Sequence, residues 1–473
     1  MYSKVKIILK MEYSFSSQNG KTINVYKGYG YRCVRTLKNG TKSYRCVHKS
    51  CSARAHEQNE VVEIKSEHNH VPDPGAYEAR KSISAIKERA TTSRDTPRFI
   101  IQTEQATLSS EAISSLPQYR SIQRTVQRKR KLNSEPIVQP RAIPDINIPD
   151  QLRSTLRGEN FLLHDSGSDS ENRFFIFGSE ANLDTLTDNW KWFADGTFKV
   201  APQLFYQLTT IHALVQGTVL PMLYLFLQRK DAATYKEALN AVKTLRPRMN
   251  PQSFLCDYEQ AFHIAVRDVF GNDVTLVGCL FHFGQCIWRK VQAHGLTESY
   301  ASNEAVRMAC KQLMALAFVP VESVVTAFET VQENAPDDVI PVFNYFEDTW
   351  IGRPIIRNRR RPPTFPPEMW SIHQRTIDEL PRTNNSVEAW HRAFQGTVGY
   401  VHPTVYKLIE AIRLEQSHTE NLLVRIHNGQ HRPTKNAKYQ RKEAALKTLA
   451  TDFANRNLQD YLRAVSHHCE LNV

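Results

Sequence analysis

The sequence predicts an α+β protein with several domains. A small β-domain held together by cysteine and histidine precedes a larger α/β domain with a helical insertion and a helical C-terminal tail. The first 74 residues contain short Tyr-, Val- and Ile-rich runs between glycines, together with a Cys/His box. Strand-like and helix-like runs alternate between residues 190 and 281, and helical periodicity dominates from residue 287. A chain of 473 residues, of which 41% are hydrophobic, can bury more than one core.

The first domain, residues 12–74, is predicted to be all-β. The Asn39-Gly40 dipeptide separates the strand-like runs 31–35 and 43–47, and Asn-Gly in that position favours a two-residue hairpin. In that register Cys33 lies opposite Cys46. Cys33 would then either fill the core or replace a metal ligand.

Four side chains of this domain have the spacing of a tetrahedral metal site: Cys46-x4-Cys51 and His68-x-His70. Two thiolates and two imidazoles are donors that structural Zn²⁺ prefers. A domain of this size with few large aliphatic residues also needs a cross-link to stabilise it, and a bound zinc ion provides one in a reducing compartment. We therefore predict a structural zinc ion. The alternative ligands are His48, His56 and Cys33.

Basic residues concentrate in the first third of the chain. The net charge is +13, and residues 1–140 carry 25 Lys and Arg against 12 Asp and Glu, which leaves 36 against 36 for the rest. A basic arm on a neutral body predicts a polyanion-binding module, with nucleic acid as the polyanion. The alternative is a solvated surface.

A helical pattern occupies residues 75–135 and ends in a basic run. The segment is either a second DNA-contacting unit of helix-turn-helix type or a solvated linker helix with a nuclear-localisation run. A proline-rich linker, residues 136–150, follows and marks a domain boundary. The candidate DNA contacts of the basic run are Arg120, Arg124, Arg128, Lys129, Arg130 and Lys131.

Cysteine usage and hydropathy limit the class of protein. Eight cysteines in 473 residues are too few for a disulfide scaffold, which favours reduced thiols and an intracellular protein. Residues 1–10 lack the pattern of a signal peptide. Polar residues, Gly217 and Pro221 interrupt the apolar stretch 204–227, so we expect a buried hairpin there rather than a membrane span.

The second large domain spans residues 151–396. The order β-β-β-α-β-α-β within it is that of an RNase H-like fold. In that topology the first and fourth strands are parallel neighbours, so their carboxyl ends meet at one sheet edge. The predicted elements are strands at 190–194, 205–213 and 220–227, a helix at 232–245, a strand at 253–256, a helix at 259–270 and a strand at 274–281.

Three acidic residues lie at the ends or the starts of these predicted elements. Asp195 and Asp257 end two of the apolar runs, and Glu388 opens a helical pattern far downstream. Carboxylate oxygens bind hard cations, and a pair of Mg²⁺ or Mn²⁺ ions can hold both the attacking and the leaving oxygen of a phosphodiester. We therefore predict that these three acids are catalytic and bind two such ions.

Each acid also has a structural alternative when it is taken alone. Asp195 could form a turn with the following glycine, and Asp257 could cap the next helix. Glu388, three residues after Asn385, could accept a hydrogen bond from the Asn385 backbone N–H and so complete a capping box. The nearby Glu259 is expected to point along its helix rather than to bind a metal ion.

Residues 287–380 are predicted to form a helical insertion, and residues 397–473 a helical C-terminal region. A basic, proline-flanked loop lies within the insertion. Its arginines are candidate phosphate contacts, with a solvated loop as the alternative. These arginines are Arg353, Arg357, Arg359, Arg360 and Arg361.

The first domain resembles the FLYWCH-type zinc finger. Tyr44 departs from the pattern, since that family usually has tryptophan there. The resemblance implies a DNA-binding β-module built on the zinc site. It rests on Phe15, the Gly20-Lys21 turn, Tyr29-Gly-Tyr-Arg32, the Cys and His pairs, and Cys51-Ser-Ala-Arg54.

Residues 174–396 resemble the transposase domain of Mutator-like elements, in the RNase H-like superfamily. A FLYWCH-type finger ahead of such a domain is a combination seen in animal proteins of this kind. The matching motifs are Ala194-Asp-Gly-Thr-Phe-Lys199, Leu220-Pro221 followed by Lys230 and Tyr235, Asp257-Tyr-Glu259, Gly278-Cys-Leu-Phe-His-Phe283 with Gln285, and Arg382-Thr-Asn-Asn-Ser-Val-Glu-Ala-Trp-His391.

The resemblance implies a transposase-like protein that binds double-stranded DNA and cuts and joins its strands with the three acids. Cys279 and His282 match the family's Cys-x2-His signature, which either binds zinc or braces the site, and core packing is the favoured interpretation. His391, one helical turn beyond Glu388, either orients that carboxylate, contacts a phosphate or packs as an ordinary histidine.

The implied location is the nucleus, and the implied assembly is a homodimer or a higher oligomer. No membrane and no small-molecule substrate are expected. One alternative function is that of a domesticated transposase, which binds DNA or regulates transcription without strand transfer. Another is an RNase H-like nuclease without strand transfer, which fits the acids but not the surrounding motifs. Clustered carboxylates repel one another without a metal ion, and this favours retained chemistry.

Overall fold

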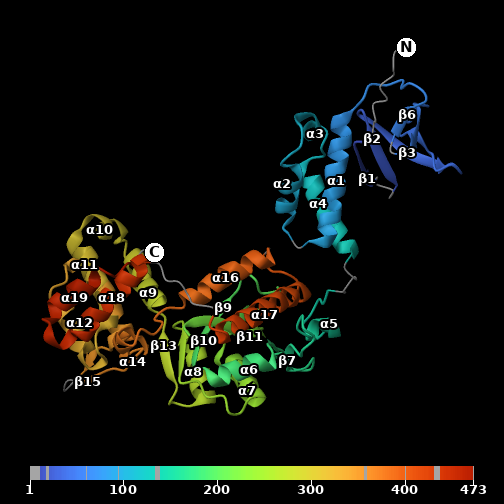
Figure 1. Ribbon diagram of the computed structural model, residues 1–473. Helices are drawn as coiled ribbons and strands as arrows, with labels where there is room; N and C mark the ends of the chain where they lie inside the picture. The colour runs from blue at the N-terminus through green and yellow to red at the C-terminus, as the bar shows by residue number, and fades with distance from the viewer. Residues whose placement is uncertain are drawn as a thin grey trace. The chain divides into compact units, whose positions relative to one another are not determined.

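The computed structural model describes residues 11–16, 21–59, 61–93, 95–133, 139–355, 359–399, 401–430 and 437–471. The chain divides into two compact units, Met1–Val138 and Gln139–Val473 (Figure 1).

The first unit begins with a six-stranded antiparallel sheet, in which every strand pairs with its neighbour in sequence. Because side chains alternate along a strand, the two faces of the sheet bury different clusters. One face buries Tyr26, Tyr31, Tyr44, Ala55 and Val62, and the other buries Phe15, Ile23 and Val25. The strands are β1 (Tyr13–Ser16), β2 (Thr22–Tyr26), β3 (Tyr29–Thr36), β4 (Lys42–Cys46), β5 (Arg54–Gln58) and β6 (Val61–Ile64).

The pairing of β3 with β4 differs from the predicted hairpin. Cys33 lies opposite Tyr44, and Tyr31 lies opposite Cys46. A three-residue loop in which Gly40 has a φ of 80°, and a β-bulge just after Cys33, together shift the register by two residues. The prediction that Cys33 faces Cys46 is therefore wrong. Cys33 is exposed and lies outside the Cys/His cluster.

Four helices follow the sheet among the described residues of the first unit, and three of them share a core. Tyr77 of the first helix lies against Gly30 of β3, where a Cβ would come within 2.4 Å of the tyrosine ring. The segment is thus a packed helical unit joined to the sheet, and the solvated-linker alternative is wrong. The helices are α1 (Pro74–Thr92), α2 (Pro97–Gln105), α3 (Ser110–Ser114) and α4 (Tyr119–Asn133), and the shared core is Ile86, Ala90, Ile100, Ile101, Ile122 and Val126.

The second unit is built on a seven-stranded mixed sheet of order β13-β12-β9-β10-β11-β8-β7. Between residues 191 and 278 the element order is the predicted β-β-β-α-β-α-β. β9 and β12 pair in parallel, which confirms the prediction that these two strands are parallel neighbours. The strands are β7 (Leu162–Asp165), β8 (Phe175–Phe177), β9 (Lys191–Thr197), β10 (Gln207–Val215), β11 (Thr218–Leu227), β12 (Ser253–Cys256) and β13 (Thr275–Gly278).

The structure adds elements that the sequence pattern did not predict and moves two boundaries. β7, β8 and the short helices α5 (Asp150–Arg153) and α6 (Glu180–Asp188) had no predicted counterpart. β9 continues three residues beyond its predicted end, and β13 stops three residues before its predicted end.

The apolar stretch 204–227 forms the β10–β11 hairpin, as predicted. Gln216 and Gly217 form its turn with φ values of 45° and 83°, the left-handed pair that a type I′ turn needs. Among the described residues, no helix combines the length and apolar character that a membrane crossing requires.

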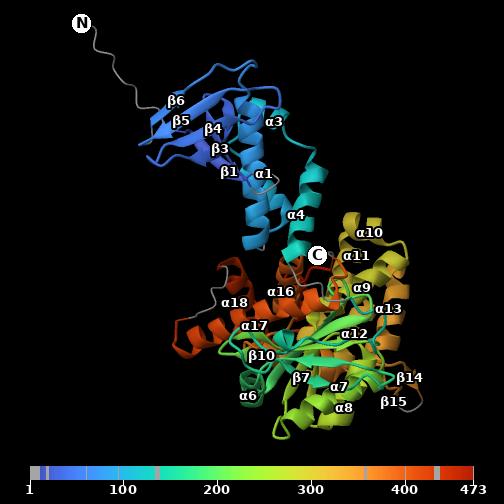
Figure 2. The ribbon, with the colours of Figure 1, turned by 90° about the vertical axis from the view of Figure 1, so that its right-hand side faces the viewer.

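Helices cover both faces of the central sheet (Figures 1 and 2). α7 (Ala232–Leu245) and α8 (Gln260–Phe270) bury the face that carries Trp192 and Phe254. α16 (Asn385–Val398) covers the opposite face, where Val387 packs on Phe193 and Leu255. α17 (Val405–His427) lies beside α16 and contacts β11.

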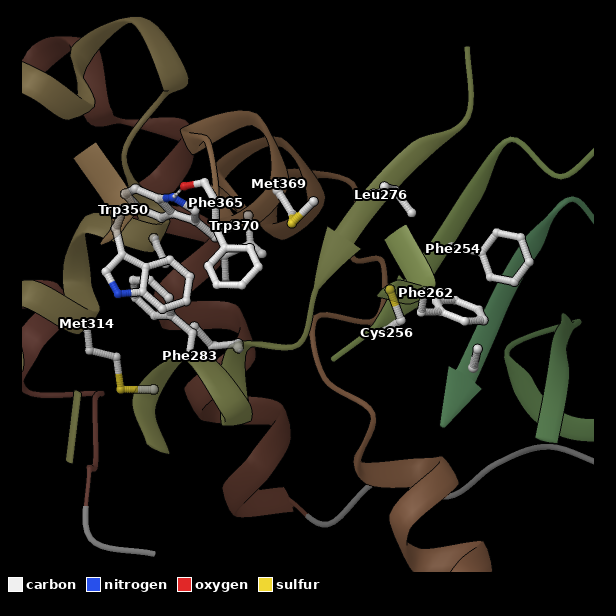
Figure 3. Close-up of a cluster of buried hydrophobic side chains, with 14 of the residues drawn as sticks. Phe254, Cys256, Phe262, Leu276, Phe283, Met314, Trp350, Phe365, Met369 and Trp370 are labelled. Atoms are coloured by element: carbon white, nitrogen blue, oxygen red, sulfur yellow. Dashed lines mark hydrogen bonds between the residues drawn. The ribbon is translucent and has the colours of Figure 1, made fainter. Parts of the chain in front are cut away.

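The predicted insertion is a helical lobe with an aromatic core. Phe283 and Trp370 stack with ring centroids 5.1 Å apart, and Trp350 packs edge-on against Phe283 (Figure 3). The lobe contains α9 (Leu280–Ala293), α10 (Thr297–Ser302), α11 (Glu304–Ala315), α12 (Val324–Glu333), α13 (Ile340–Phe346), β14 (Pro354–Ile355), β15 (Arg359–Arg360), α14 (Pro367–Trp370) and α15 (His373–Ile377), and the C-terminal α18 (Ala437–Thr451) and α19 (Leu458–Ser466) pack on it.

Candidate active site and metal centre

Three distant segments meet at one edge of the central sheet. Phe193 of β9 is the register partner of Leu255 of β12. Asp195 and Asp257 each lie two residues further along, so they lie at the same level of neighbouring parallel strands, Asp195 within β9 and Asp257 directly after β12. Asn384, at the start of α16, donates from its side chain to the Ala194 carbonyl at 3.2 Å. This bond fixes the helix that carries Glu388 against β9.

The structure excludes the simple alternatives for the three acids. Asp195 belongs to a strand that continues to Thr197 rather than to a turn. The N-cap of α8 is Glu259, not Asp257. The N-cap of α16 is Asn384, with no side-chain capping bond, so Glu388 lies one position beyond the place of a capping-box partner.

His282 of α9 lies between two of the acids. Its Nδ1 is 2.6 Å from Asp257 Oδ1, and its Nε2 is 3.8 Å from Glu388 Oε1. The short contact is an ion pair without the angles of a hydrogen bond. Within the described part of the chain, Asp257 Oδ1, His282 Nδ1 and Glu388 Oε1 are all buried without a hydrogen-bond partner. Of these atoms, the two carboxylate oxygens are ones that a bound cation would satisfy.

The electrostatics of this group are strongly coupled. Burial alone would lower the pKa of His282, but Asp257 and Cys279 outweigh it and raise this pKa to about 11. Burial raises the pKa of Glu388, and Asp195 and Asp257 add to the rise while His282 opposes it. The negative charges of the acids therefore repel one another, and the positive charge of the His282 imidazolium offsets part of this repulsion.

Cys279, the other member of the Cys-x2-His pair, is more deeply buried than His282. Its thiol is fully buried among Phe193, Leu255 and Val387, and it accepts the Asn384 backbone N–H at 3.2 Å. Its sulfur also lies within 4.8 Å of ligand atoms of Asp257 and His282. Cys279 thus packs in the core and, together with Asp257 and His282, also forms a group of ligand atoms that could hold a metal ion.

His391 contacts Asp195 and not Glu388, the acid that one of its three alternatives named. Its Nδ1 lies 3.2 Å from Asp195 Oδ2, and its Nε2 lies 3.3 Å from the Thr210 hydroxyl. The same hydroxyl is 2.9 Å from Nε2 of His212, whose pKa burial lowers well below the usual value. Sequence reasoning missed Thr210 and His212, because a threonine and a histidine inside an apolar strand give no signal of their own.

Glu259, beside the acids in sequence, is held by a tyrosine of α7. Its carboxylate accepts the Tyr235 hydroxyl at 3.1 Å, and burial raises its pKa. Gln207 donates to the same hydroxyl at 2.6 Å. A Cβ on Gly196 would come within 2.7 Å of the Gln207 amide oxygen, so this network explains the glycine after Asp195.

The predicted zinc ligands of the first unit converge. The distance from Cys46 Sγ to His70 Nε2 is 3.3 Å, that from Cys51 Sγ to His68 Nδ1 is 3.4 Å, and the two imidazole nitrogens are 3.3 Å apart. Tetrahedral zinc with bonds of about 2.0 to 2.3 Å places its ligand atoms roughly 3.3 to 3.8 Å apart. The four side chains therefore fit a zinc ion.

Neighbouring groups orient these ligands. The Tyr31 hydroxyl lies 2.6 Å from Nε2 of His68, and the Val71 carbonyl lies 3.0 Å from Nδ1 of His70. Each contact leaves the other ring nitrogen free for the metal. The backbone N–H groups of His48 and Ala53 donate to the two sulfurs, which suits thiolates. Of the alternative ligands, Cys33 and His56 lie outside the cluster, and His48 stacks on His70 instead of joining it.

One face of the first sheet, the face that also carries Gly30, bears a row of arginines that the sequence did not reveal. Arg32 of β3 is the register partner of Arg45 of β4, which is the partner of Arg54 of β5. All three are exposed, and among the described residues none forms an ion pair with an acid. We call these three residues the arginine row.

The predicted basic DNA contacts of α4 fall into two groups, exposed side chains and side chains that are bonded within the protein. On α4, Arg120, Arg124 and Arg128 are exposed at four-residue spacing, and Lys129 is half-buried. The side chain of Lys131 lies outside the description. Arg130 instead donates to the carbonyls of Ala90, Ser93 and Asp95.

The loop of the insertion shows the same division. Arg359 and Arg361 are exposed, whereas Arg360 pairs with Glu329 and Glu347, and Arg353 pairs with Asp348. Arg357 lies outside the described residues.

Comparison with protein families places two regions of the chain. Residues 191–285, from the start of β9 into α9, match the MULE transposase domain. Residues 15–70 match the FLYWCH zinc finger domain. The chain therefore carries a FLYWCH zinc finger followed by a MULE transposase domain. A search of curated proteins found no match. The transposase region includes Asp195, Asp257 and His282, and the finger region includes all four candidate zinc ligands.

Proposed function

We propose that the chain is a transposase-like nuclear protein that binds double-stranded DNA through its first unit and cuts and joins DNA strands through its second. One observation carries the catalytic half. Asp195, Asp257 and Glu388 converge from two strands and a helix, and Asp257 and Glu388 each have a buried carboxylate oxygen without a hydrogen-bond partner. The strand order β11-β10-β9-β12-β13 supports an RNase H-like assignment for this domain.

The donor set suits hard divalent cations. Two Mg²⁺ or Mn²⁺ ions on the three carboxylates would supply an activated water or 3′-hydroxyl and stabilise the leaving oxygen. The raised pKa of Glu388 reflects burial and the repulsion of Asp195 and Asp257, which cations would relieve. In the proposal, the three acids are the catalytic residues, and His282 and His391 are positioning residues.

The positioning residues act on different acids. His391, held by Thr210, fixes one oxygen of Asp195, and the Gly196 N–H fixes the other at 2.8 Å. His282 lies between Asp257 and Glu388 and places a positive charge beside them. The site therefore keeps its shape before DNA arrives, which lowers the cost of assembling it.

Two exposed basic features support DNA binding by the first unit. The arginine row crosses three strands of the finger, and Arg120, Arg124 and Arg128 form a stripe along α4. Guanidinium groups in such arrays neutralise phosphates. The proposed zinc ion is structural, because all four of its ligands come from the protein.

The test is Mg²⁺- or Mn²⁺-dependent nicking and strand transfer on DNA that carries the sequences flanking the gene. We expect Asp195→Asn, Asp257→Asn and Glu388→Gln each to abolish both reactions, because each removes a metal ligand. Asp273→Asn, an exposed acid before β13, is the matched control and should retain activity. Activity that survives the three substitutions would contradict the site.

An inactive wild type that still binds zinc, DNA and Mn²⁺ would instead identify a domesticated DNA-binding protein. The same preparation separates the two outcomes, since DNA binding and strand chemistry are measured independently.

A further inference from the structure

Two exposed aromatic rings lie just beyond the strand that carries Asp195. Phe198 is 46% exposed and Tyr206 is 47% exposed. Their rings meet edge to face with centroids 5.2 Å apart. Lys230 Nζ lies 5.9 Å from the Phe198 ring centre and 5.8 Å from that of Tyr206. A pair of solvent-exposed aromatics that shares one ammonium group is the feature to explain.

The elements around β9 build this group. Phe198 directly follows β9, Tyr206 directly precedes β10, and Lys230 follows β11. The Tyr206 N–H donates to the Leu227 carbonyl at 2.9 Å, so the backbone of the cluster is part of the sheet. The rings are therefore held on a rigid support.

The cluster lies close to the acids. Phe198 is three residues beyond Asp195, or about 10 Å at the rise of a strand, a span of roughly three base steps in DNA. A DNA strand that presents its phosphate to the acids can therefore reach the cluster with a nearby nucleotide.

We propose that Phe198 and Tyr206 form a stacking platform for an unpaired base about three nucleotides from the reacting phosphate, with Lys230 on a phosphate beside that base. Exposed aromatic rings interleaved with cations are what proteins use to hold single-stranded nucleic acid. A base inside a duplex offers no free face to such rings, so the platform selects a melted or frayed nucleotide. Lys199 and Arg229, both exposed beside the platform, add positive charge for the strand.

The inference rests on the proposed function, and its test uses a separate readout. The full chain is titrated, without added Mg²⁺ or Mn²⁺, with a duplex containing a three-nucleotide bubble and with the fully paired duplex. 2-Aminopurine in the bubble reports stacking. The variants are Phe198→Ala, Tyr206→Ala and their double variant. Trp190→Ala, an aromatic that is 51% exposed directly before β9, is the control.

The wild type is expected to bind the bubble more tightly than the duplex and to quench the 2-aminopurine. The double variant should lose roughly 5- to 100-fold of bubble affinity and the quenching, with duplex affinity unchanged. Phe198→Trp should keep the preference and Phe198→Leu should lose it, because stacking needs a ring. Trp190→Ala should behave as the wild type.

An unchanged preference for the bubble in the double variant would overturn the platform, as would an equal loss of bubble and duplex binding. The two proposals fail separately. A chain that discriminates the bubble but never nicks DNA loses the proposed chemistry and keeps the platform, and a chain that nicks without discriminating loses only the platform.

Discussion

The His391 Nδ1 lies 3.2 Å from Asp195 Oδ2, although one residue belongs to α16 and the other to the first long strand of the central sheet. The Thr210 hydroxyl lies 3.3 Å from the other ring nitrogen, and the Gly196 N–H binds the second oxygen of Asp195. Both oxygens of this acid are therefore oriented by the protein. A carboxylate held in this way is prepared to meet a cation without rearranging.

We expect His391→Ala to weaken Mn²⁺ binding and to slow Mn²⁺-dependent nicking by about 10- to 100-fold, the effect of losing a group that orients a metal ligand. The KM for DNA should stay unchanged, because His391 contacts Asp195 rather than DNA. His391→Asn, which keeps a donor, should recover part of the rate. His427→Ala, an exposed histidine at the end of α17, serves as the control. Unaltered Mn²⁺ affinity in His391→Ala would show that the contact has no orienting role.

Removal of His282 should destabilise the metal-free second unit in a pH-dependent way. The pKa of His282 is raised to about 11 in the folded chain, above its ordinary value near 6.5. Its contribution is therefore fully present below pH 6.5 and is lost as the pH rises toward the folded value. We expect His282→Gln to lower the free energy of unfolding by about 1 kcal/mol at pH 6.5, with the difference shrinking toward pH 10.

Urea unfolding followed by tryptophan fluorescence measures this difference. All six tryptophans lie between residues 190 and 390, so the signal reports the second unit alone. His418→Gln, an exposed histidine of α17, is the matched variant and should show no such trend. A gap between wild type and His282→Gln that widens with rising pH would contradict the ion-pair assignment.

Zinc should be needed by the first unit only. Cys46→Ser and His70→Ala are expected to abolish zinc binding, since each removes one of four convergent ligands. Zinc content by atomic absorption and the circular dichroism of the chain measure the loss. Tryptophan fluorescence should stay native, because the second unit has its own core. Cys33→Ser should keep its zinc, and a loss there would contradict the observed register.

The sequence pattern predicted the sheet around the acids well because each signal was local. Nearly all of β10 and β11 is buried, so their apolar runs were distinct, and the parallel pairing of β9 with β12 followed from element order. β7 and β8 are only four and three residues long and left no comparable pattern. The register error at Cys33 arose because a bulge shifts the pairing without changing the composition of either strand.

The candidate site was predictable in its residues but not in its contacts. Asp195, Asp257 and Glu388 stood out by their context, whereas the position of His282 between two acids depends on where α9 begins. α9 begins at Leu280 because β13 ends early, at Gly278. Tertiary packing, not local sequence, sets that end. Likewise, nothing in the spacing of Arg130 and Arg360 distinguished them from exposed arginines, yet both are used within the fold.

The arginine row gives a quantitative test of the DNA-binding face. Like charges directly opposite one another on neighbouring strands are unfavourable, so a row of three needs an anionic partner to be advantageous. If Arg32, Arg45 and Arg54 each neutralise one phosphate, the triple Arg→Gln variant should reduce the slope of log K against log salt by about 2.7, or about 0.9 for each contact.

The slope is measured by fluorescence anisotropy of a labelled duplex with the full chain at several salt concentrations. Arg98→Gln removes the same charge from an exposed residue of α2, outside the sheet, and should leave the slope nearly unchanged. The melting temperature of the triple variant should not fall, because the substitutions relieve repulsion, so weakened binding cannot be attributed to unfolding. If Arg98→Gln lowers the slope as much as each single variant of the row, general charge rather than this face binds DNA.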